Sequence, residues 1–380
     1  MLGLATALNS SSLKKKSSLT NKFSAELDGT GDYIDVSVLS SDLDKEAGTI
    51  SMWIRVQATA SNESFFNCSA GSSSDNKISI IYNTSSAKIQ ANYKSGGTDM
   101  VADHAIAGDD LVGLGWFHLA MTYNTSTPLI QLFLNGTRVA QRTSSITAIS
   151  TDVAIDRIRL GSNSNADNTY HQGHIDEFIY IGGKDLTETE MLLLYNNGKP
   201  DDIGDLPSAI YSAIKCWLRF GDGQIDGDAD QTSVVFDEKN STLGSEIMTD
   251  GNFSEGLTHY TTNNVEVSNG VVSFDSNSDW IFQNHGSSFT TGKIYKVSTE
   301  GTGNLRFRYG FTSTAGTLQA FTVGTNLYFV ADSDTNRIQF FGSASSSAAT
   351  LSNISVKQVN GVAGLMTNMT EADITNDVPS

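Results

Sequence analysis

The sequence predicts an all-β protein, namely an antiparallel two-sheet β-sandwich with one short helix, followed by a second, smaller β-sandwich. Apolar and polar residues alternate in short runs along most of the 380 residues, for example at 34–38 and 49–56. Only the stretch from Thr187 to Gly198 carries both a start and a stop signal for a helix. Because charged residues make up only 17% of the chain, Ser, Thr, Asn and Gly must form most of the polar surface, which suits strand edges and turns.

Strands of the first sandwich follow one another at close spacing. The Asn135-Gly136 pair between the runs IQLFL and TRVAQ predicts a type I′ hairpin turn, because that turn needs positive φ at both positions. A last strand at 174–181 is apolar on both faces, which is typical of a strand buried between two layers. The other strands of this sandwich are predicted at 77–82, 87–93, 116–123, 130–135 and 157–160.

The predicted helix follows this last strand. Thr187 indicates the N-cap, and Glu190 three residues later completes a capping box in which each side chain bonds the other residue's backbone amide. Leu186 and Met191 stand at the two positions whose apolar side chains pack together across a helix start. Gly198 predicts the end of the helix, because glycine adopts the left-handed conformation at low cost.

The remainder of the chain predicts further strands. CWLRFGDG and SVVFDEKN indicate two strands around an acidic loop that holds Asp222, Asp226, Asp228 and Asp230. An Asn269-Gly270 turn and the runs DWIFQN, KIYKVST, LRFRYGF, LYFVA, RIQFF and NISVKQV then predict the smaller sandwich. The predicted division is an N-terminal arm (1–22), a first sandwich (23–199), connecting strands with the acidic loop (200–244), a second sandwich (245–360) and a C-terminal tail (361–380).

Two families are similar to these segments. FSAELDGTGDYIDV, TISMWIRV, GWFHLAMTYN and IQLFLNGTRVA occur in the order found in laminin G-like domains of the concanavalin A-like lectin and glucanase class, over residues 23–199. The resemblance implies a concanavalin A-like sandwich, and such domains bind glycans, proteins or calcium or act as structural modules. EIMTDGNFSEGL, GKIYKVSTE and LSNISVKQV resemble jelly-roll carbohydrate-binding modules, over residues 245–360.

Charge and cysteine content restrict the partners. The formal net charge of −18 argues against nucleic acid and against an anionic membrane surface, because both would repel the protein. No apolar run has the length of a membrane span, and MLGLATALNSSS lacks the charged start of an export signal. Cys68 and Cys216 are expected to be free thiols. The basic cluster Lys14, Lys15 and Lys16 is predicted to anchor the arm on an acidic partner, the alternative being a solvated tail.

Catalytic residues are not predicted. Glycosidases of the concanavalin A-like class place carboxylates on alternate residues of one strand, so that an acid and a nucleophile flank the glycosidic bond. Asp176 and Glu177 are adjacent, so strand alternation should turn them to opposite faces. No phosphate loop and no Gly-x-Ser-x-Gly elbow occurs. The sequence therefore predicts a protein that is not an enzyme and that requires no cofactor.

Candidate binding residues are of two kinds. The family resemblance implies a calcium site at the sandwich edge, with Asp28, Asp32 and Asp176 as candidate ligands. The alternative is that the first two shape the DGTGD turn and the third caps a strand-end amide. Sugar binding needs an aromatic platform beside hydrogen-bonding groups. The candidate platforms are Trp280, Tyr260 and Tyr309, each of which has the alternative of being a core or edge aromatic.

Taken together, the two sandwiches, the few cysteines, the acidic surface and the short arm resemble virion proteins of tailed bacteriophages, particularly marine ones. The resemblance implies a virion surface protein, such as a capsid decoration, head fibre or tail appendage subunit, made in the host cytoplasm and released by lysis. Its expected partners are other virion proteins, further copies of itself and glycans of the host surface. The alternatives are a secreted or cell-surface lectin or adhesin of a marine microbe, and a purely structural β-module that binds no sugar.

Overall fold

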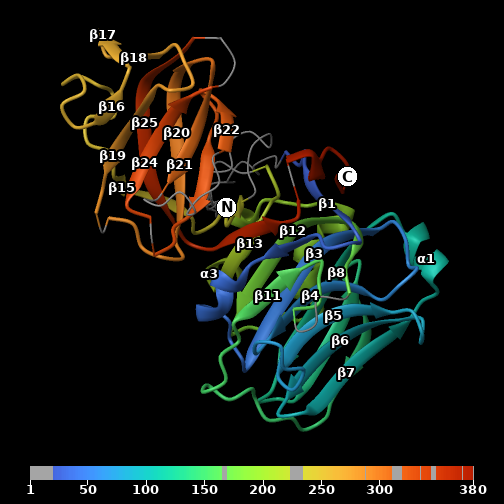
Figure 1. Cartoon of the computed structure of the whole chain (residues 1–380). Helices are drawn as coiled ribbons and strands as arrows, with labels where there is room; N and C mark the ends of the chain where they lie inside the picture. The colour runs from blue at the N-terminus through green and yellow to red at the C-terminus, as the bar shows by residue number, and fades with distance from the viewer. Residues whose placement is uncertain are drawn as a thin grey trace, which may run out of the picture. The chain divides into compact units, whose positions relative to one another are not determined.

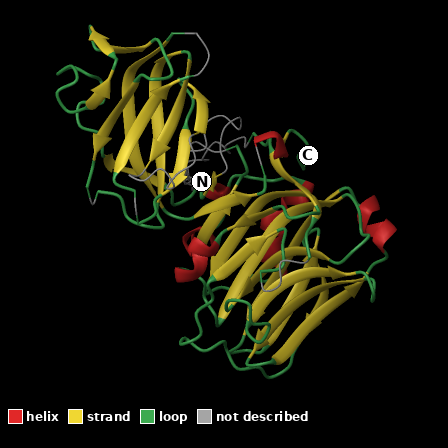
Figure 2. Ribbon diagram, in the orientation of Figure 1, coloured by secondary structure: helices red, strands yellow, loops and turns green. Residues whose placement is uncertain are grey.

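The computed structural model describes residues 20–164, 169–222, 234–286, 288–309, 319–333, 335–343, 348–369 and 371–379. Almost all of the regular structure is β-strand, as Figure 2 shows, which confirms the all-β fold class. The chain forms two compact units. The first unit comprises Met1–Gly31, Leu39–Trp217 and Thr375–Ser380, and the second comprises Asp32–Val38 and Leu218–Ile374.

One antiparallel sheet of the first unit has the order β10-β9-β8-β3-β12-β1, and β13 pairs with β12 (Figure 1). Its long central strands β3, β8 and β12 are buried along almost their whole length, as expected of strands covered on both faces. The strands are β10 (Thr137–Arg142), β9 (Leu129–Leu134), β8 (Trp116–Asn124), β3 (Ala47–Val56), β12 (Gln172–Gly182), β1 (Ser24–Asp28) and β13 (Ile214–Leu218).

The other sheet of the first unit faces the first one across a hydrophobic core. Phe66 and Phe178 stack across the core with ring centroids 5.9 Å apart, and Tyr93 and Tyr123 meet at 5.5 Å. These contacts establish the predicted two-sheet sandwich. The strands, in spatial order, are β11 (Arg157–Leu160), β4 (Glu63–Ser69), β5 (Lys77–Asn83), β6 (Lys88–Ser95) and β7 (Thr98–Ala105), of which β4 and β7 were not predicted.

The predicted hairpin joins β9 and β10. Asn135 and Gly136 have φ values of 50° and 73°, and Leu134 pairs with Thr137 across the two-residue turn. This is the type I′ geometry that the Asn-Gly pair indicates. The prediction is confirmed.

The predicted helix is α2 (Glu188–Tyr195), and its capping box is formed. The backbone N–H of Glu190 donates to Thr187 Oγ1 over 3.3 Å, and the N–H of Thr187 donates to Glu190 Oε2 over 2.9 Å. The α-helix ends before the predicted Gly198, because Asn196 already takes the left-handed conformation, with φ of 44°. Asparagine tolerates that conformation better than other residues with a side chain. A 3₁₀ turn, Asn196–Gly198, follows, and Gly198 has the predicted positive φ, at 96°.

The chain after α2 and the short helices complete this unit. Helices α1 (Gly108–Gly113) and α3 (Ser208–Ala213), six residues each, were not predicted. Helix α2, the chain that follows it and α3 cover the outer face of the first sheet. Their shared apolar cluster is Ala120, Phe133, Ile179, Ile181, Leu186, Met191, Leu194, Ile203, Ile210, Ile214 and Trp217.

A second β-sandwich makes up most of the second unit. One sheet has the order β17-β18-β25-β20-β23 with β15 paired to β25, and the other has the order β16-β19-β24-β21-β22. The Asn269-Gly270 turn joins β17 and β18 as predicted. The strands are β15 (Thr242–Glu246), β16 (Thr261–Asn263), β17 (Glu266–Ser268), β18 (Val271–Phe274), β19 (Trp280–Asn284), β20 (Ile294–Thr302), β21 (Asn304–Tyr309), β22 (Gln319–Thr322), β23 (Leu327–Val330), β24 (Arg337–Gly342) and β25 (Ala349–Asn360).

A further ladder in the second unit joins three segments that are distant in sequence. β26 (Ala363–Thr367) pairs with both β14 (Val234–Phe236) and β2 (Tyr33–Asp35). The strand predicted at 34–38 therefore ends early. Asp35 accepts a hydrogen bond from the backbone N–H of Ser37 over 2.8 Å, and this local turn leads into the 3₁₀ segment Ser37–Ser41.

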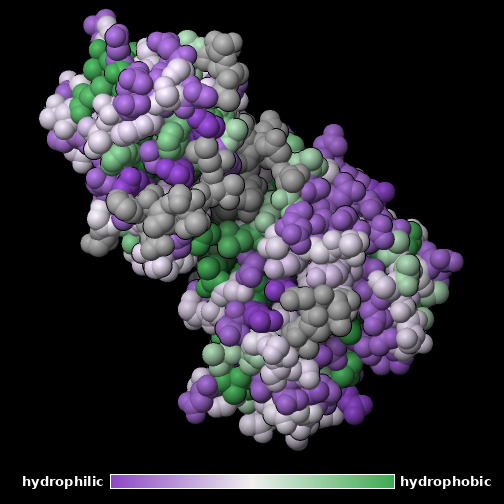
Figure 3. Space-filling model, in the orientation of Figure 1, coloured by the Kyte–Doolittle hydropathy of each residue, from purple (hydrophilic) through white to green (hydrophobic). Residues whose placement is uncertain are grey.

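The drawn surface is mainly polar, as the composition indicates, and both cysteines are buried. On the face drawn in Figure 3, hydrophilic and intermediate residues predominate and hydrophobic ones are scattered. Cys68 and Cys216 are buried and form no disulfide among the described residues, as predicted, and burial raises the pKa of Cys68 to about 12. Among the helices of the described residues, none combines the length and apolar character needed to cross a membrane.

Candidate ligand pocket on the outer face of the first sandwich

Strand β12 contains a β-bulge beside its two carboxylates. The ladder with β3 pairs Asp176 with Trp53 and next pairs Ile179 with Ser51, so β12 holds one residue more than its partner. Glu177 lies in the bulge with φ of 47°, a left-handed conformation that is uncommon for a residue with a side chain. The bulge interrupts the alternation of faces along the strand.

Both carboxylates consequently lie on the outer face of the sheet. Phe178 points into the core, where it stacks on Phe66. Glu177 instead accepts a hydrogen bond from the indole N–H of Trp217, which belongs to the outer apolar cluster. Asp176 lies opposite Trp53, and directly paired residues share a face. The prediction that the adjacent carboxylates point to opposite faces was therefore wrong.

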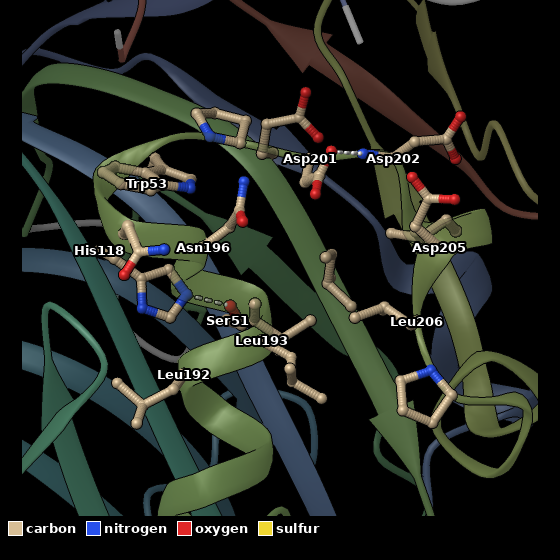
Figure 4. A pocket seen from close by; sticks show the side chains of 17 residues that line it. Ser51, Trp53, His118, Leu192, Leu193, Asn196, Asp201, Asp202, Asp205 and Leu206 are labelled. Carbon is tan, nitrogen blue, oxygen red and sulfur yellow. Dashed lines mark hydrogen bonds between the residues drawn. The ribbon is translucent and has the colours of Figure 1, made fainter. Parts of the chain in front are cut away.

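A pocket of about 450 Å³ opens between this outer face and the segment from α2 to α3 (Figure 4). That volume is within the range of pockets that hold small ligands. The pocket is called the ligand pocket below. Its lining residues are Ser51, Trp53, His118, Glu177, Ile179, Leu192, Leu193, Leu194, Asn196, Asn197, Pro200, Asp201, Asp202, Ile203, Asp205, Leu206 and Pro207.

The sheet side of the ligand pocket carries a neutral polar pair. Ser51 Oγ and His118 Nε2 are 2.7 Å apart, and both residues are buried. Burial lowers the pKa of His118 to about 3, so the imidazole is neutral at pH 7. His118 Nδ1 has no hydrogen-bond partner among the described residues. The pair consequently lacks the carboxylate that orients the histidine of a catalytic triad.

Trp53 has two roles in the ligand pocket. Its ring stacks on Tyr195 of α2 with centroids 5.9 Å apart and an interplanar angle of 24°, and its edge meets His118 at 5.5 Å. Trp53 is therefore a structural residue, with 4% of its surface exposed, and it also lines the pocket.

Acidic and amide side chains surround the rest of the ligand pocket. Glu177 comes from the bulge, whereas Asp201, Asp202 and Asp205 come from the chain after α2. Asp202 Oδ1 accepts from the backbone N–H of Gly204 over 2.8 Å, which holds this turn in place. The described lining includes no lysine and no arginine. The site is therefore negatively charged.

Apolar side chains form one edge of the ligand pocket. Leu192 and Leu193 of α2 are 49% and 43% exposed, although α2 buries Met191 and Leu194 beneath them. Leu206 lies across the opening from them in Figure 4. The pocket therefore offers both hydrogen-bonding groups and apolar surface to a ligand.

Another polar cluster lies on the same face of the sheet, beside the C-terminal residues. Asp377 forms an ion pair with Arg55 and accepts from Trp116 Nε1 over 2.8 Å. His174 Nε2 is 3.7 Å from Asp377 Oδ2, and Ser24 Oγ donates to the Asp377 carbonyl. Burial lowers the pKa of His174. These contacts tie the end of the chain to the sandwich.

The three calcium candidates are not brought together. Asp28 pairs with Gln172, four residues before Asp176 on β12, which separates the two Cα atoms by about 13 Å along the strand. Asp28 accepts from the backbone N–H of Thr30 over 2.6 Å, as the turn-shaping alternative predicted. Asp32 belongs to the second unit. Within the described residues, no group of three His, Cys, Asp or Glu side chains could hold a metal ion.

The three aromatic candidates lie in the second unit and have different surroundings. Tyr260 packs on Phe253 with ring centroids 5.1 Å apart, and Tyr309 stacks on Phe329 at 4.3 Å, so both lie against the core. Trp280 is half-buried at the start of β19, and the next residue, Ile281, belongs to the core. Only Trp280 therefore lies on the side of the sheet that faces away from the core.

Some sequence-based candidates lie outside the described residues. They are Lys14, Lys15 and Lys16 of the arm and Asp226, Asp228 and Asp230 of the acidic loop. Asp222, at the start of that loop, is described. Its carbonyl accepts from Arg219 Nη1 over 2.9 Å.

Sequence reasoning missed Glu177 as a site residue. Strict alternation would have placed its carboxylate in the core of the sandwich, where burial of a charge costs several kcal/mol. That cost was the available indication that HIDEFIYI needs a bulge. The aspartates after α2 carried no comparable signal, because only tertiary packing brings them to β3 and β8.

The two facing antiparallel sheets place the first unit among the antiparallel β-sandwich proteins. More particularly, residues 28–191 match the family model described as the concanavalin A-like lectin/glucanases superfamily. This segment is therefore a concanavalin A-like domain, as its motifs predicted. No curated protein sequence matches the chain.

Several solved structures are similar to parts of this chain at low sequence identity. The CBM40 of the Ruminococcus gnavus IT-sialidase is 18% identical, covers 47% of this chain and all of its own, and has a TM-score of 0.38. A putative carbohydrate binding protein from Bacteroides ovatus is 14% identical over 57% of this chain and 55% of its own, with a TM-score of 0.39. Tailspike protein 2 of bacteriophage CBA120 is 15% identical over 48% and 32%, with a TM-score of 0.32.

Proposed function

We propose that this protein binds saccharides and that the ligand pocket takes a neutral sugar. The observation that carries the proposal is the combination of acceptor side chains with an apolar edge in one pocket. Sugar hydroxyls donate hydrogen bonds to carboxylate and amide oxygens, and the C–H faces of sugar rings pack on apolar side chains. Glu177 and Asp205 supply acceptors, and Leu192 and Leu193 supply apolar surface.

The charge of the ligand pocket favours a neutral ligand over an anionic one. Glu177 is 4% exposed, and Asp201, Asp202 and Asp205 lie around the opening. Charges in a partly buried site interact more strongly than charges in water. An anionic sugar would meet this repulsion without a lysine or arginine among the described lining residues to offset it.

We propose binding without catalysis and without a cofactor. Hydrolysis of a glycosidic bond needs two carboxyl groups that are placed on either side of it and can exchange protons with the ligand. Glu177 is held by the Trp217 indole, and Asp176 accepts from Asn21 Nδ2 over 2.8 Å and from the backbone N–H of Glu177 over 2.7 Å. Both carboxylates thus already have partners in the protein.

A glycan panel with the full chain tests this proposal. Neutral oligosaccharides should bind, and Glu177→Gln should weaken the best of them about 5- to 10-fold, because a charged acceptor becomes a neutral one. Asp110→Asn, the same change at an exposed position of α1, is the control and should leave affinity unchanged. Equal affinity of Glu177→Gln and the wild type would contradict the proposal. Release of reducing sugar from any ligand would contradict the absence of catalysis.

We further propose that the protein works in several copies on a virion surface, as a decoration, head fibre or tail appendage subunit. Two β-sandwiches in one chain, the net charge of −18 and two buried cysteines outside any disulfide of the described residues support this setting. Its partners would be other virion proteins, copies of itself and host-surface glycans, and repeated copies would add weak contacts into useful avidity.

Mass spectrometry of purified particles tests the virion setting. The protein should copurify with particles, and replacement of Lys14, Lys15 and Lys16 by serine should reduce incorporation if those residues anchor it. Detection only at the cell surface or in the medium would favour the lectin or adhesin of a marine microbe. Presence in particles without binding to any glycan would favour the structural module.

A further inference from the structure

The second sandwich carries a cluster of arginines and aromatic rings on one face of the sheet β16-β19-β24-β21-β22, whose strands are labelled in Figure 1. Leu305 and Phe307 of β21 belong to the hydrophobic core, so alternation places Arg306 and Arg308 on the opposite face. We call the cluster the arginine face. It consists of Arg306, Arg308, Arg337, Trp280, Phe282 and Phe341.

Strand register lines these side chains up in rows. Phe341 of β24 pairs with Trp280 on one side and with Arg306 on the other, so three strands contribute to one row. In the next row, Gln339 lies between Phe282 and Arg308. Neighbouring strands are about 4.8 Å apart, so each row spans about 10 Å. The surface is thus comparable in length with a disaccharide.

The guanidinium groups lie over the aromatic rings. Arg308 and Arg306 approach the Phe341 ring with centroid distances of 5.1 and 5.8 Å, and Arg337 lies 4.4 Å from the centroid of Phe282. Stacking on a ring holds a guanidinium flat while its edge still has N–H donors to offer. Arg306 is further positioned by donating from Nε to the carbonyl of Gly342 over 2.9 Å.

Two arginines of the arginine face, Arg306 and Arg308, have no carboxylate partner among the described residues. Among the described residues, neither Arg306 nor Arg308 forms an ion pair; Arg308 Nη2 donates to the neutral Gln339, and Arg308 Nε is buried without a hydrogen-bond partner. Burial and then repulsion from Arg308 lower the pKa of Arg337, so these two like charges lie close together. Two guanidinium groups without an ion pair among the described residues, on a chain with net charge −18, are typical of a site for an anion.

We propose that the arginine face binds an acidic saccharide, one that carries a carboxylate or a sulfate group. Arg306 and Arg308 would pair with the acidic group, because a planar guanidinium matches the oxygens of such groups. Trp280 and Phe282, whose rings stack with centroids 5.4 Å apart, would contact the sugar ring. The net charge of the chain disfavours nucleic acid, whose long run of phosphates would be repelled outside this small face.

The arginine face has no residue in common with the ligand pocket, and its charge is of the opposite sign. The full-length protein is titrated with four probes, namely an oligomeric uronate, a sulfated galactan oligosaccharide, a neutral oligosaccharide of matched length and a single-stranded DNA oligonucleotide. At least one acidic saccharide should bind the wild type at least tenfold more tightly than the neutral probe. The two acidic probes distinguish a carboxylate from a sulfate as the recognised group. Binding of DNA as tight as that of either acidic saccharide would overturn the proposal.

Substitutions test whether the acidic saccharide binds to the second sandwich. Arg308→Gln should lower affinity for the acidic saccharide at least tenfold, and Arg308→Lys, which keeps the charge and loses the planar fork, should lower it less. Lys293→Gln, the same charge change at an exposed turn of this unit, should have no effect. Glu177→Gln should not change binding of the acidic saccharide, so failure of the ligand pocket and of this site are distinguishable. Unchanged affinity in a folded Arg308→Gln variant contradicts the proposal.

Discussion

Trp217 donates its indole N–H to the carboxylate of Glu177, across 40 residues of sequence and onto the bulge of β12. This contact connects the strand after α3 to the ligand pocket. It also explains how the carboxylate of Glu177, a residue in a left-handed backbone conformation, remains buried. A buried charged acceptor needs hydrogen-bond donors, and the indole N–H supplies one.

Removal of this donor should destabilise the first unit. Trp217→Phe retains most of the apolar contact but takes one partner from a buried carboxylate, so the free energy of unfolding should fall by about 1–3 kcal/mol. Trp116→Phe is the matched control, because its indole donates to Asp377, whose side chain is 35% exposed. Urea denaturation measures both. Equal losses of unfolding free energy in the two variants would contradict a specific contribution of the Glu177 contact to stability.

The capping box should contribute measurably to the helix that borders the ligand pocket. Thr187→Ala removes the side-chain acceptor for the Glu190 amide and should lower stability by about 1 kcal/mol. Thr189→Ala, an exposed position inside the same helix, is the control and should be neutral or slightly stabilising, since alanine is the better helix former. A fall in Tm for Thr189→Ala as large as for Thr187→Ala would contradict the capping argument.

The β9–β10 hairpin should position α2 through close contact at Gly136. A Cβ at this residue would lie 2.9 Å from Leu192 Cδ2 and from Tyr195 Cβ, so Gly136→Ala should displace the helix and weaken ligand binding at the pocket. Gly96→Ala is the control, because Gly96 also has positive φ but no atom within 4 Å of the added Cβ. Both variants should lose about 1 kcal/mol to backbone strain, with a further loss only for Gly136→Ala. Thermal unfolding and glycan titration measure the difference.

Acid should destabilise the first unit through His118. Its folded pKa is lowered to about 3, so between about pH 6.5 and pH 3 the unfolded chain takes up a proton that the folded protein does not. The contribution of neutral His118 to the free energy of unfolding is therefore complete above the unfolded pKa. It falls as the pH is lowered, and at pH 5 it should be about 2 kcal/mol smaller than at pH 7.

Urea denaturation at pH 7 and pH 5 measures this effect, with Trp53, Trp116 and Trp217 as fluorescent probes in the first unit. His118→Gln should remove this contribution to the pH dependence, and His104→Gln, a partly exposed position on β7, should retain it. If His118→Gln leaves the pH dependence intact, another group is responsible.

Neither thiol should react with a thiol reagent in the native protein. Cys68 is fully buried with its pKa raised to about 12, and Cys216 is buried as well, so neither presents a thiolate to solvent at pH 8. A disulfide-exchange reagent should therefore detect no thiol in the native protein and two in urea. Rapid reaction before unfolding would contradict the buried positions.

The sequence by itself determined the features that depend on neighbouring residues. Asn135-Gly136 predicted the hairpin and Thr187 with Glu190 predicted the helix start, because positive φ and capping are decided within two to four residues. Alternation of apolar residues likewise predicted most strands and the all-β class. Motif order over residues 23–199 predicted the concanavalin A-like domain.

Only the tertiary structure decided which side chains meet. The bulge at Glu177 depends on register with β3, and register is a property of two strands rather than one. The ligand pocket combines β3, β8, β12 and the chain after α2, and the arginine face combines β19, β21 and β24. Local pattern cannot specify such groupings, because strand pairing across long loops is selected by the packing of the whole core.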